Sequence, residues 1–141
     1  MIHKDVADEL LDTMVKSVEM QFGTDVESSE LGRMVQVGHA HRLVDMLREV
    51  EASPTTRILC GGSDACNPDE RFVAPTIVVN PPRNSRLMKE EIFGPILPVH
   101  IVDSDTAAKE MIQQMVRIPT HARKPLRGSQ RYSVFCCLLA L

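Results

Sequence analysis

The segment RFVAPTIVVN, residues 71–80, predicts a β-strand because β-branched side chains crowd its second half. Pro75 lies inside this segment and cannot donate to a strand ladder, so we expect a sheet edge, a bend or a bulge there. Two shorter apolar runs, TRILCGG at residues 56–62 and ILPVHIV at residues 96–102, predict two further strands. Together the three segments predict a thin sheet.

Residues 5–22 predict an amphipathic helix ahead of these strands. Asp5 is expected to cap its start, and Gly23 is expected to end it. Apolar side chains recur every four positions, as they do along one face of a helix. The predicted stripe contains Val6, Leu10, Met14 and Val18, with Ala7, Leu11 and Val15 alongside.

Two more helices are predicted at about residues 36–51 and at residues 106–116. The second helix is closed by a Ser-Pro pair, and the third is expected to be capped by Asp103 or Asp105. The apolar stripe of the second contains Val37, Ala40, Leu43, Val44, Leu47 and Val50, and that of the third contains Ala108, Met111, Ile112 and Met115.

The order helix, helix, strand, strand, strand, helix indicates an α/β fold with a short mixed or parallel sheet flanked by helices. Three short strands make a thin sheet. We also expect the unit to be incomplete at both ends. Residues 1–116 are predicted to form one partial domain, and residues 117–141 a divergent tail that is first basic and then apolar. The apolar part, residues 132–141, could add an edge strand.

The composition, with 43% hydrophobic and 25% charged residues, is that of an ordinary soluble protein. Residues 1–116 hold 11 Lys and Arg against 19 Asp and Glu, whereas residues 117–131 hold five basic residues and no acid. The basic segment has few aromatics and no nucleic-acid motif, so we expect no nucleic-acid partner. No apolar run approaches the ~20 residues of a membrane span, and the start has no secretion signal, so a cytoplasmic location is expected.

The cysteines and histidines suggest no metal site. Cys60 and Cys66 have a spacing that fits no common zinc pattern, and His39 and His41 would point apart on a helix. His100 lies among apolar neighbours and is expected to be a core or interface residue rather than a catalyst. The four thiols, Cys60, Cys66, Cys136 and Cys137, are expected to be reduced, and none has a context that marks a nucleophile.

The segment MKEEIFGPILPV, residues 88–99, places two adjacent carboxylates before an aromatic residue, a Gly-Pro turn and a strand. With an Ala-Pro-Thr strand before it and a strand–helix pair after it, this segment resembles the late catalytic domain of aldehyde dehydrogenases. It is most similar to the branch with the class 3 and fatty aldehyde enzymes. Residues 22–47 and the glycine pair at 61–62 also resemble that branch, so the likeness covers residues 3 to about 116.

The resemblance implies NAD- or NADP-dependent oxidation of an aldehyde to a carboxylic acid. It also implies two cofactor contacts. Glu91 matches the carboxylate that binds the hydroxyls of the nicotinamide ribose, and Phe93 matches the aromatic residue packed near the cofactor. Gly94 and Pro95 would set the turn that presents both side chains, and Glu90 is expected to be a surface residue.

The catalytic residues of that family have no counterpart in the chain. A Gly-Gln-x-Cys segment is absent. Glu30 echoes the family's general-base motif, but Gly32 and Arg33 match the family's Gly-Arg pair before a helix, so Glu30 is expected to be a solvated carboxylate. We therefore expect a fragment of an NAD(P)-dependent aldehyde dehydrogenase that is inactive by itself. The alternative is a truncated, non-catalytic protein that associates with full-length dehydrogenase subunits.

Overall fold

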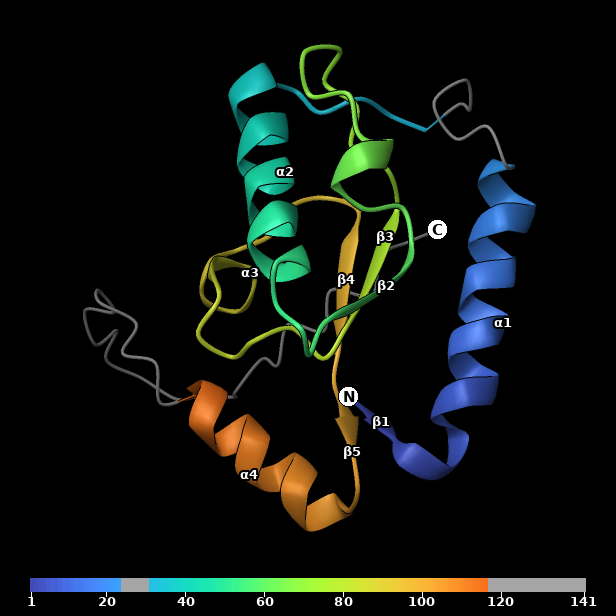
Figure 1. The fold of residues 1–141 in the computed structure, drawn as a ribbon, viewed down its shortest axis with the longest axis vertical. Coiled ribbons are helices and arrows are strands. Elements are labelled where there is room, and N and C mark those ends of the chain that lie inside the picture. Colours follow the sequence, from blue (N-terminus) through green and yellow to red (C-terminus); the bar gives the residue numbers. More distant parts are fainter. Residues whose placement is uncertain (24–30, 117–141) are drawn as a thin grey trace, which may run out of the picture.

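The computed structural model describes residues 1–23 and 31–116, and their helices and strands confirm the predicted α/β class (Figure 1). The three predicted helices and three predicted strands are present, with several short elements between them. In chain order the elements are β1 (Ile2–His3), α1 (Lys4–Phe22), α2 (Val37–Glu51), β2 (Arg57–Cys60), the 3-10 helix η1 (Ser63–Ala65), β3 (Thr76–Val79), α3 (Arg86–Lys89), β4 (Ile96–Val99), β5 (Ile101–Val102) and α4 (Asp105–Val116).

The central sheet has three strands in the order β2-β3-β4. β3 runs antiparallel to β2 and parallel to β4, so the sheet is mixed. Pro75 directly precedes β3 and takes no part in its pairing. In β2 the register of pairing shifts between Ile58, which pairs with Val78, and Cys60, which pairs with Ile77. The irregularity expected near Pro75 is therefore a bulge in the neighbouring strand.

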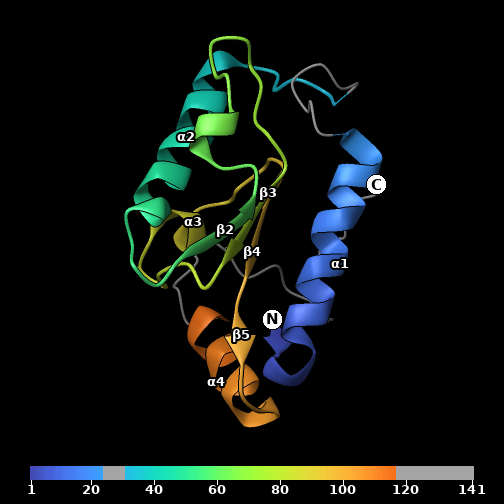
Figure 2. The same ribbon diagram turned by 45° about the vertical axis from the view of Figure 1, so that its right-hand side comes forward.

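Helices cover both faces of this sheet, with α2 on one side and α1 on the other in both views (Figures 1 and 2). All four residues of β3 are buried, as expected for a strand between two layers. Val78 packs with α2, while its neighbours Ile77 and Val79 pack with Leu11 of α1. The first cluster contains Ala40, Leu43, Met46, Leu47, Val50, Val73, Val78, Leu87 and Ile96, and the second contains Leu11, Ile77, Val79 and Val99.

A small parallel pair, β1 with β5, lies beyond the central sheet. The predicted strand at residues 96–102 is divided at His100, whose backbone oxygen accepts a hydrogen bond from Ile2 at 2.9 Å. His100 is only 7% exposed, which confirms the prediction of a buried histidine. α4 follows β5 and packs against it.

Two predicted helix caps are wrong. α1 begins at Lys4 directly after β1, and Nδ1 of His3 accepts the hydrogen bond from the Asp5 amide at 3.3 Å, so His3 rather than Asp5 is the N-cap. α4 begins at Asp105, and Oγ of Ser104 accepts from the amide of Ala107 at 3.2 Å. In both places the residue directly before the helix supplies the acceptor.

The predicted stripe of α1 is only partly buried. Ala7 and Leu11 are buried, whereas Val6 and Leu10 are 52% and 42% exposed. The predicted end of this helix at Gly23 is confirmed. Gly23 has a positive φ of 75°, and its amide donates a hydrogen bond to the carbonyl oxygen of Glu19, which closes the last turn. The predictions for Glu30 and for the tail at residues 117–141, with Cys136 and Cys137, lie outside the described residues.

Candidate functional site

The loop that joins α3 to β4, residues 90–95, carries both predicted cofactor contacts. Glu91 and Phe93 are both exposed, and the exposed fraction of residue Phe93 is 74%. Phe93 also has a φ of +47°, a conformation that is uncommon for a residue with a Cβ atom. An exposed aromatic ring on a strained backbone is typical of a site that receives another molecule.

Arg42 of α2 holds this loop by its backbone. Its Nη1 donates to the carbonyl oxygen of Glu91 at 3.0 Å, and its Nη2 donates to that of Ile92 at 2.9 Å. Nη1 also lies 3.7 Å from Oε2 of Glu90. A planar guanidinium can serve three acceptors in this fixed arrangement, whereas a lysine ammonium is a single point charge.

Glu90 and Glu91 lie side by side in sequence but have different surroundings. Oε1 of Glu90 accepts from Nε of Arg86 at 2.8 Å, and this hydrogen bond, with the charges of Arg86 and Arg42, lowers the pKa of the Glu90 carboxyl. Within residues 1–23 and 31–116, the Glu91 carboxylate has no hydrogen-bond or ion-pair partner. Glu90 is a surface residue, as predicted, and Glu91 keeps its acceptors available.

The turn after Phe93 packs closely on α2. A Cβ atom added to Gly94 would lie 2.4 Å from Cδ1 of Leu43, which is fully buried, so a larger residue there would force Leu43 to move. The carbonyl oxygen of Pro95 accepts from the amide of Thr76 at 2.9 Å and joins the turn to the start of β3. Gly94 and Pro95 therefore set the turn that leads into the sheet.

A second polar cluster, which the sequence analysis did not identify, lies at the end of β2. The carboxylate of Glu51 accepts from the amide of Ser63 at 2.7 Å and from its hydroxyl at 2.5 Å. The hydroxyl of Thr76 accepts from the amide of Gly62 at 3.1 Å. These hydrogen bonds occupy both carboxylate oxygens of Glu51 and hold the glycine turn against the start of β3, which indicates a structural role.

The two described thiols are poor candidates for a nucleophile. Burial raises the pKa of both Cys60 and Cys66, which disfavours the reactive thiolate. Sγ of Cys66 lies 3.2 Å from the oxygen of Gly62 and 3.3 Å from the nitrogen of Ala74, so it occupies a structural position. Across the described part of the chain, no three His, Cys, Asp or Glu side chains gather as a metal site would require.

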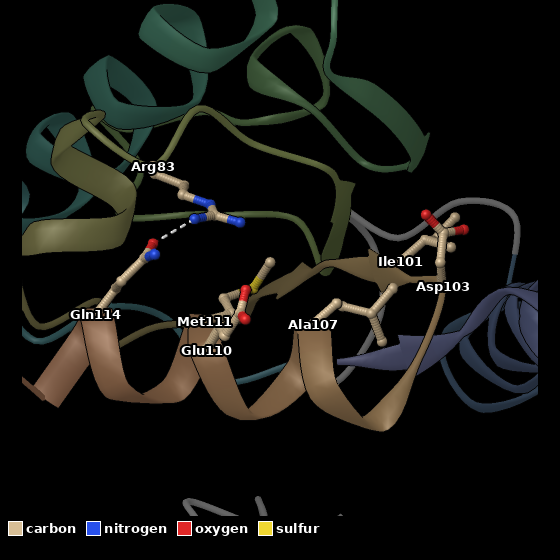
Figure 3. Close-up of a pocket in the computed structure, with 8 residues that line it drawn as sticks. Arg83, Ile101, Asp103, Ala107, Glu110, Met111 and Gln114 are labelled. Carbon is tan, nitrogen blue, oxygen red and sulfur yellow. Dashed lines mark hydrogen bonds between the residues drawn. The ribbon is translucent and has the colours of Figure 1, made fainter.

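A cavity of about 220 Å³ lies between β5 and α4 (Figure 3), and no residue of the loop at 90–95 lines it. Arg83 extends across it and donates from Nη1 to Oε1 of Gln114 at 2.5 Å. Asp103 and Glu110 also line it. Because carboxylates and an already bonded guanidinium share the space, the cavity has no single charge preference. None of the helices described is both long and apolar enough to cross a membrane, and the cytoplasmic location stays a prediction.

Comparison with known proteins gives the family. The sequence pattern of the "Aldehyde dehydrogenase family" matches residues 1–115, and the chain belongs to that family. A 4,4'-diaponeurosporen-aldehyde dehydrogenase of Staphylococcus aureus is 33% identical over 115 residues, which are 81% of this chain and 24% of that protein. Aldehyde dehydrogenase family 3 member F1 of Arabidopsis thaliana is 36% identical over 129 residues, which are 89% of this chain and 24% of the relative.

Solved structures agree with this assignment. The substrate-bound state of Staphylococcus aureus AldH has a TM-score of 0.70 at 33% identity, and the match covers 81% of this chain and 24% of that one. Betaine aldehyde dehydrogenase of the same organism, solved with NAD⁺, has a TM-score of 0.61 at 20% identity over 77% of this chain and 22% of that one, a likeness of fold alone. The chain spans about a quarter of the length of these relatives, and its fold is part of the aldehyde dehydrogenase fold.

Proposed function

We propose that this chain serves NAD(P)-dependent aldehyde oxidation by contributing cofactor contacts at residues 90–95, in the class 3 and fatty aldehyde branch of the family. The observation that carries the proposal is the exposed, unpaired carboxylate of Glu91 beside the doubly paired Glu90. Relatives named as family 3 members support the branch.

The chemistry of Glu91 suits the ribose of a nicotinamide nucleotide. A carboxylate has two oxygens that can accept from two neighbouring hydroxyls, and hydrogen bonds to a charged acceptor are strong. The Phe93 ring, 74% exposed two residues later, offers an apolar surface beside the carboxylate. When bound, the nicotinamide supplies the hydride acceptor for the oxidation. Glu91 and Phe93 bind and orient it.

The contact can be mapped on the 141-residue chain labelled with ¹⁵N. We expect titration with NAD⁺ or NADP⁺ to shift the backbone resonances of Glu91, Phe93 and Gly94, with the rest of the spectrum little changed. Shifts confined to other residues, or no shift at millimolar cofactor, would refute the proposed contact. Comparison of the two nucleotides would also show which of them the loop prefers.

We further propose that the chain does not oxidise aldehydes by itself. Its sequence has no Gly-Gln-x-Cys segment, and burial raises the pKa of both described thiols. Pure 141-residue protein with NAD⁺ or NADP⁺ and an aldehyde is expected to form no reduced cofactor above the blank. Reduced cofactor that disappears in a variant with all four cysteines replaced by serine would contradict this.

A second candidate function is non-catalytic association with full-length dehydrogenase subunits. It is favoured by the apolar side chains that remain exposed, among them Val35 at 81% and Met20 at 87%. The matching test is co-purification of the tagged chain with a full-length family member. Elution of the chain only as a free monomer, with no enzyme retained, would exclude this function.

A further inference from the structure

The strained conformation of Phe93 needs support from its neighbours. A residue with a Cβ atom and a positive φ is less stable than in an ordinary conformation, and it persists only where the surrounding contacts fix it. The side chain of Phe93 provides little of that support, because the residue is 74% exposed. The contacts that fix the loop must therefore act on its backbone or on adjacent residues.

Two consecutive residues of α2 provide these contacts. Arg42 donates to the carbonyl oxygens of Glu91 and Ile92, at 3.0 and 2.9 Å, immediately before Phe93. Leu43 packs against the backbone of Gly94 immediately after it, so closely that a Cβ atom there would lie 2.4 Å away. Phe93 is held between a polar clamp on one side and a steric contact on the other.

Arg42 is well placed to act as the clamp. Its side chain is 28% exposed, and it makes a further contact to Glu90, so the guanidinium has little freedom to leave the loop. The two carbonyl acceptors belong to successive residues and bind different nitrogens of one planar group. A lysine could keep the charge near Glu90, but its ammonium lacks the rigid fork that holds both carbonyls.

We propose that Arg42 is a positioning residue that fixes the backbone of Glu91 and Ile92, and thereby aims the Glu91 carboxylate and the Phe93 ring at the cofactor. The inference rests on the function proposed above. Arg42 itself does not touch the cofactor in this proposal. It acts through the two carbonyls, and its loss should disorder the loop while the core remains folded.

The test uses the full 141-residue chain with ¹⁵N labelling, as wild type and as the variants Arg42→Ala and Arg42→Lys. Arg48→Ala is the matched control, because Arg48 lies on the same helix, is more exposed and, among the described residues, forms an ion pair with Asp45 alone, at 3.6 Å. The first measurement is the ¹⁵N heteronuclear NOE of residues 91–94, with residues 76–79 of β3 as the reference for the fold. The second is titration with NAD⁺.

Both Arg42 variants are expected to lower the NOE of residues 91–94 to values typical of a flexible loop and to leave β3 unchanged. They should also lower the affinity for NAD⁺ about tenfold, since the hydrogen bonds from a charged donor to the loop are lost. Arg48→Ala should match the wild type in both measurements. If Arg42→Ala also loses the β3 signals, that variant has unfolded. The NOE of residues 91–94 in Arg42→Lys, which keeps the charge, then tests the positioning role.

An NOE at residues 91–94 that stays at the wild-type value in Arg42→Lys and Arg42→Ala would overturn the positioning role, whatever happens to cofactor binding. A failure of the proposed function would give a different result. In that case the wild-type loop gives no response to NAD⁺ or NADP⁺, and the NOE alone still decides whether Arg42 orders the loop.

Discussion

Replacement of Gly61 by alanine tests the packing that joins β2 to β3. Gly61 has a φ of +72°, and a Cβ atom there would lie 2.4 Å from both the carbonyl oxygen of Pro75 and Oγ1 of Thr76. The left-handed conformation costs a residue with a Cβ atom about 1–2 kcal/mol. Relief of the overlap needs a backbone shift that costs a further ~1–3 kcal/mol, because the Thr76 hydroxyl is itself bonded to the Gly62 amide.

The expected loss in the free energy of unfolding is about 2–4 kcal/mol, after allowance for the smaller conformational freedom of alanine in the unfolded chain. The assay is urea unfolding followed by circular dichroism. Gly38→Ala is the control, since Gly38 lies in α2 and a Cβ atom added there meets no described neighbouring residue within 4 Å. Alanine at this position should raise the free energy of unfolding by up to ~1 kcal/mol. A Gly61→Ala variant within about 0.5 kcal/mol of the wild type would refute the packing described here.

Two further predictions concern titratable groups. Burial, the Arg83 charge and the amino terminus lower the pKa of His100 in the folded chain. As the pH falls below about 6.5, the unfolded chain therefore protonates this histidine first, and the free energy of unfolding should decrease. His100→Gln should flatten that part of the pH profile of urea midpoints. Equal slopes for the wild type and the variant would contradict this. Cys60 and Cys66 should react with iodoacetamide more slowly in the folded chain than in urea, as peptide mapping can measure, because burial raises the pKa of both thiols.

The main helices and strands could be predicted from sequence because their signals are local. The stripe of α2 predicts most of its buried face, since Ala40, Leu43 and Val44 are among the most buried residues. Val37 was wrongly included, because it is 43% exposed at the start of the helix. The periodicity of α1 was less informative, because Val6 and Leu10 extend the apolar stripe but lie exposed. Hydrophobic spacing identifies a helix, whereas the width of its buried face depends on what the tertiary structure places against it.

The short elements and the helix caps depend on distant partners. β1 exists because Ile2 and His3 pair with β5, almost one hundred residues later in the chain. That pairing ends the strand at His3 and makes its side chain the cap in place of Asp5. No local pattern in the first five residues contains this information.

The candidate site was predicted only in part, for the same reason. The resemblance of residues 88–99 to aldehyde dehydrogenases indicated Glu91 and Phe93, but their contact with a cofactor remains a prediction. Arg42 was missed because it precedes Glu91 by 49 positions and acts through backbone carbonyls, which leave no trace in the sequence of the loop. A lone arginine on a helix gives no sequence signal of such a role.

The central claim, that Glu91 is a cofactor contact, is tested most directly by the NAD⁺ affinity of Glu91→Gln, measured on the full chain by NMR titration. The glutamine keeps the size of the side chain and removes its charge, so we predict binding about tenfold weaker than in the wild type. Glu9→Gln is the matched control, because Glu9 is an exposed residue of α1, and this variant should bind as the wild type does. Equal affinity of Glu91→Gln and the wild type would contradict the account.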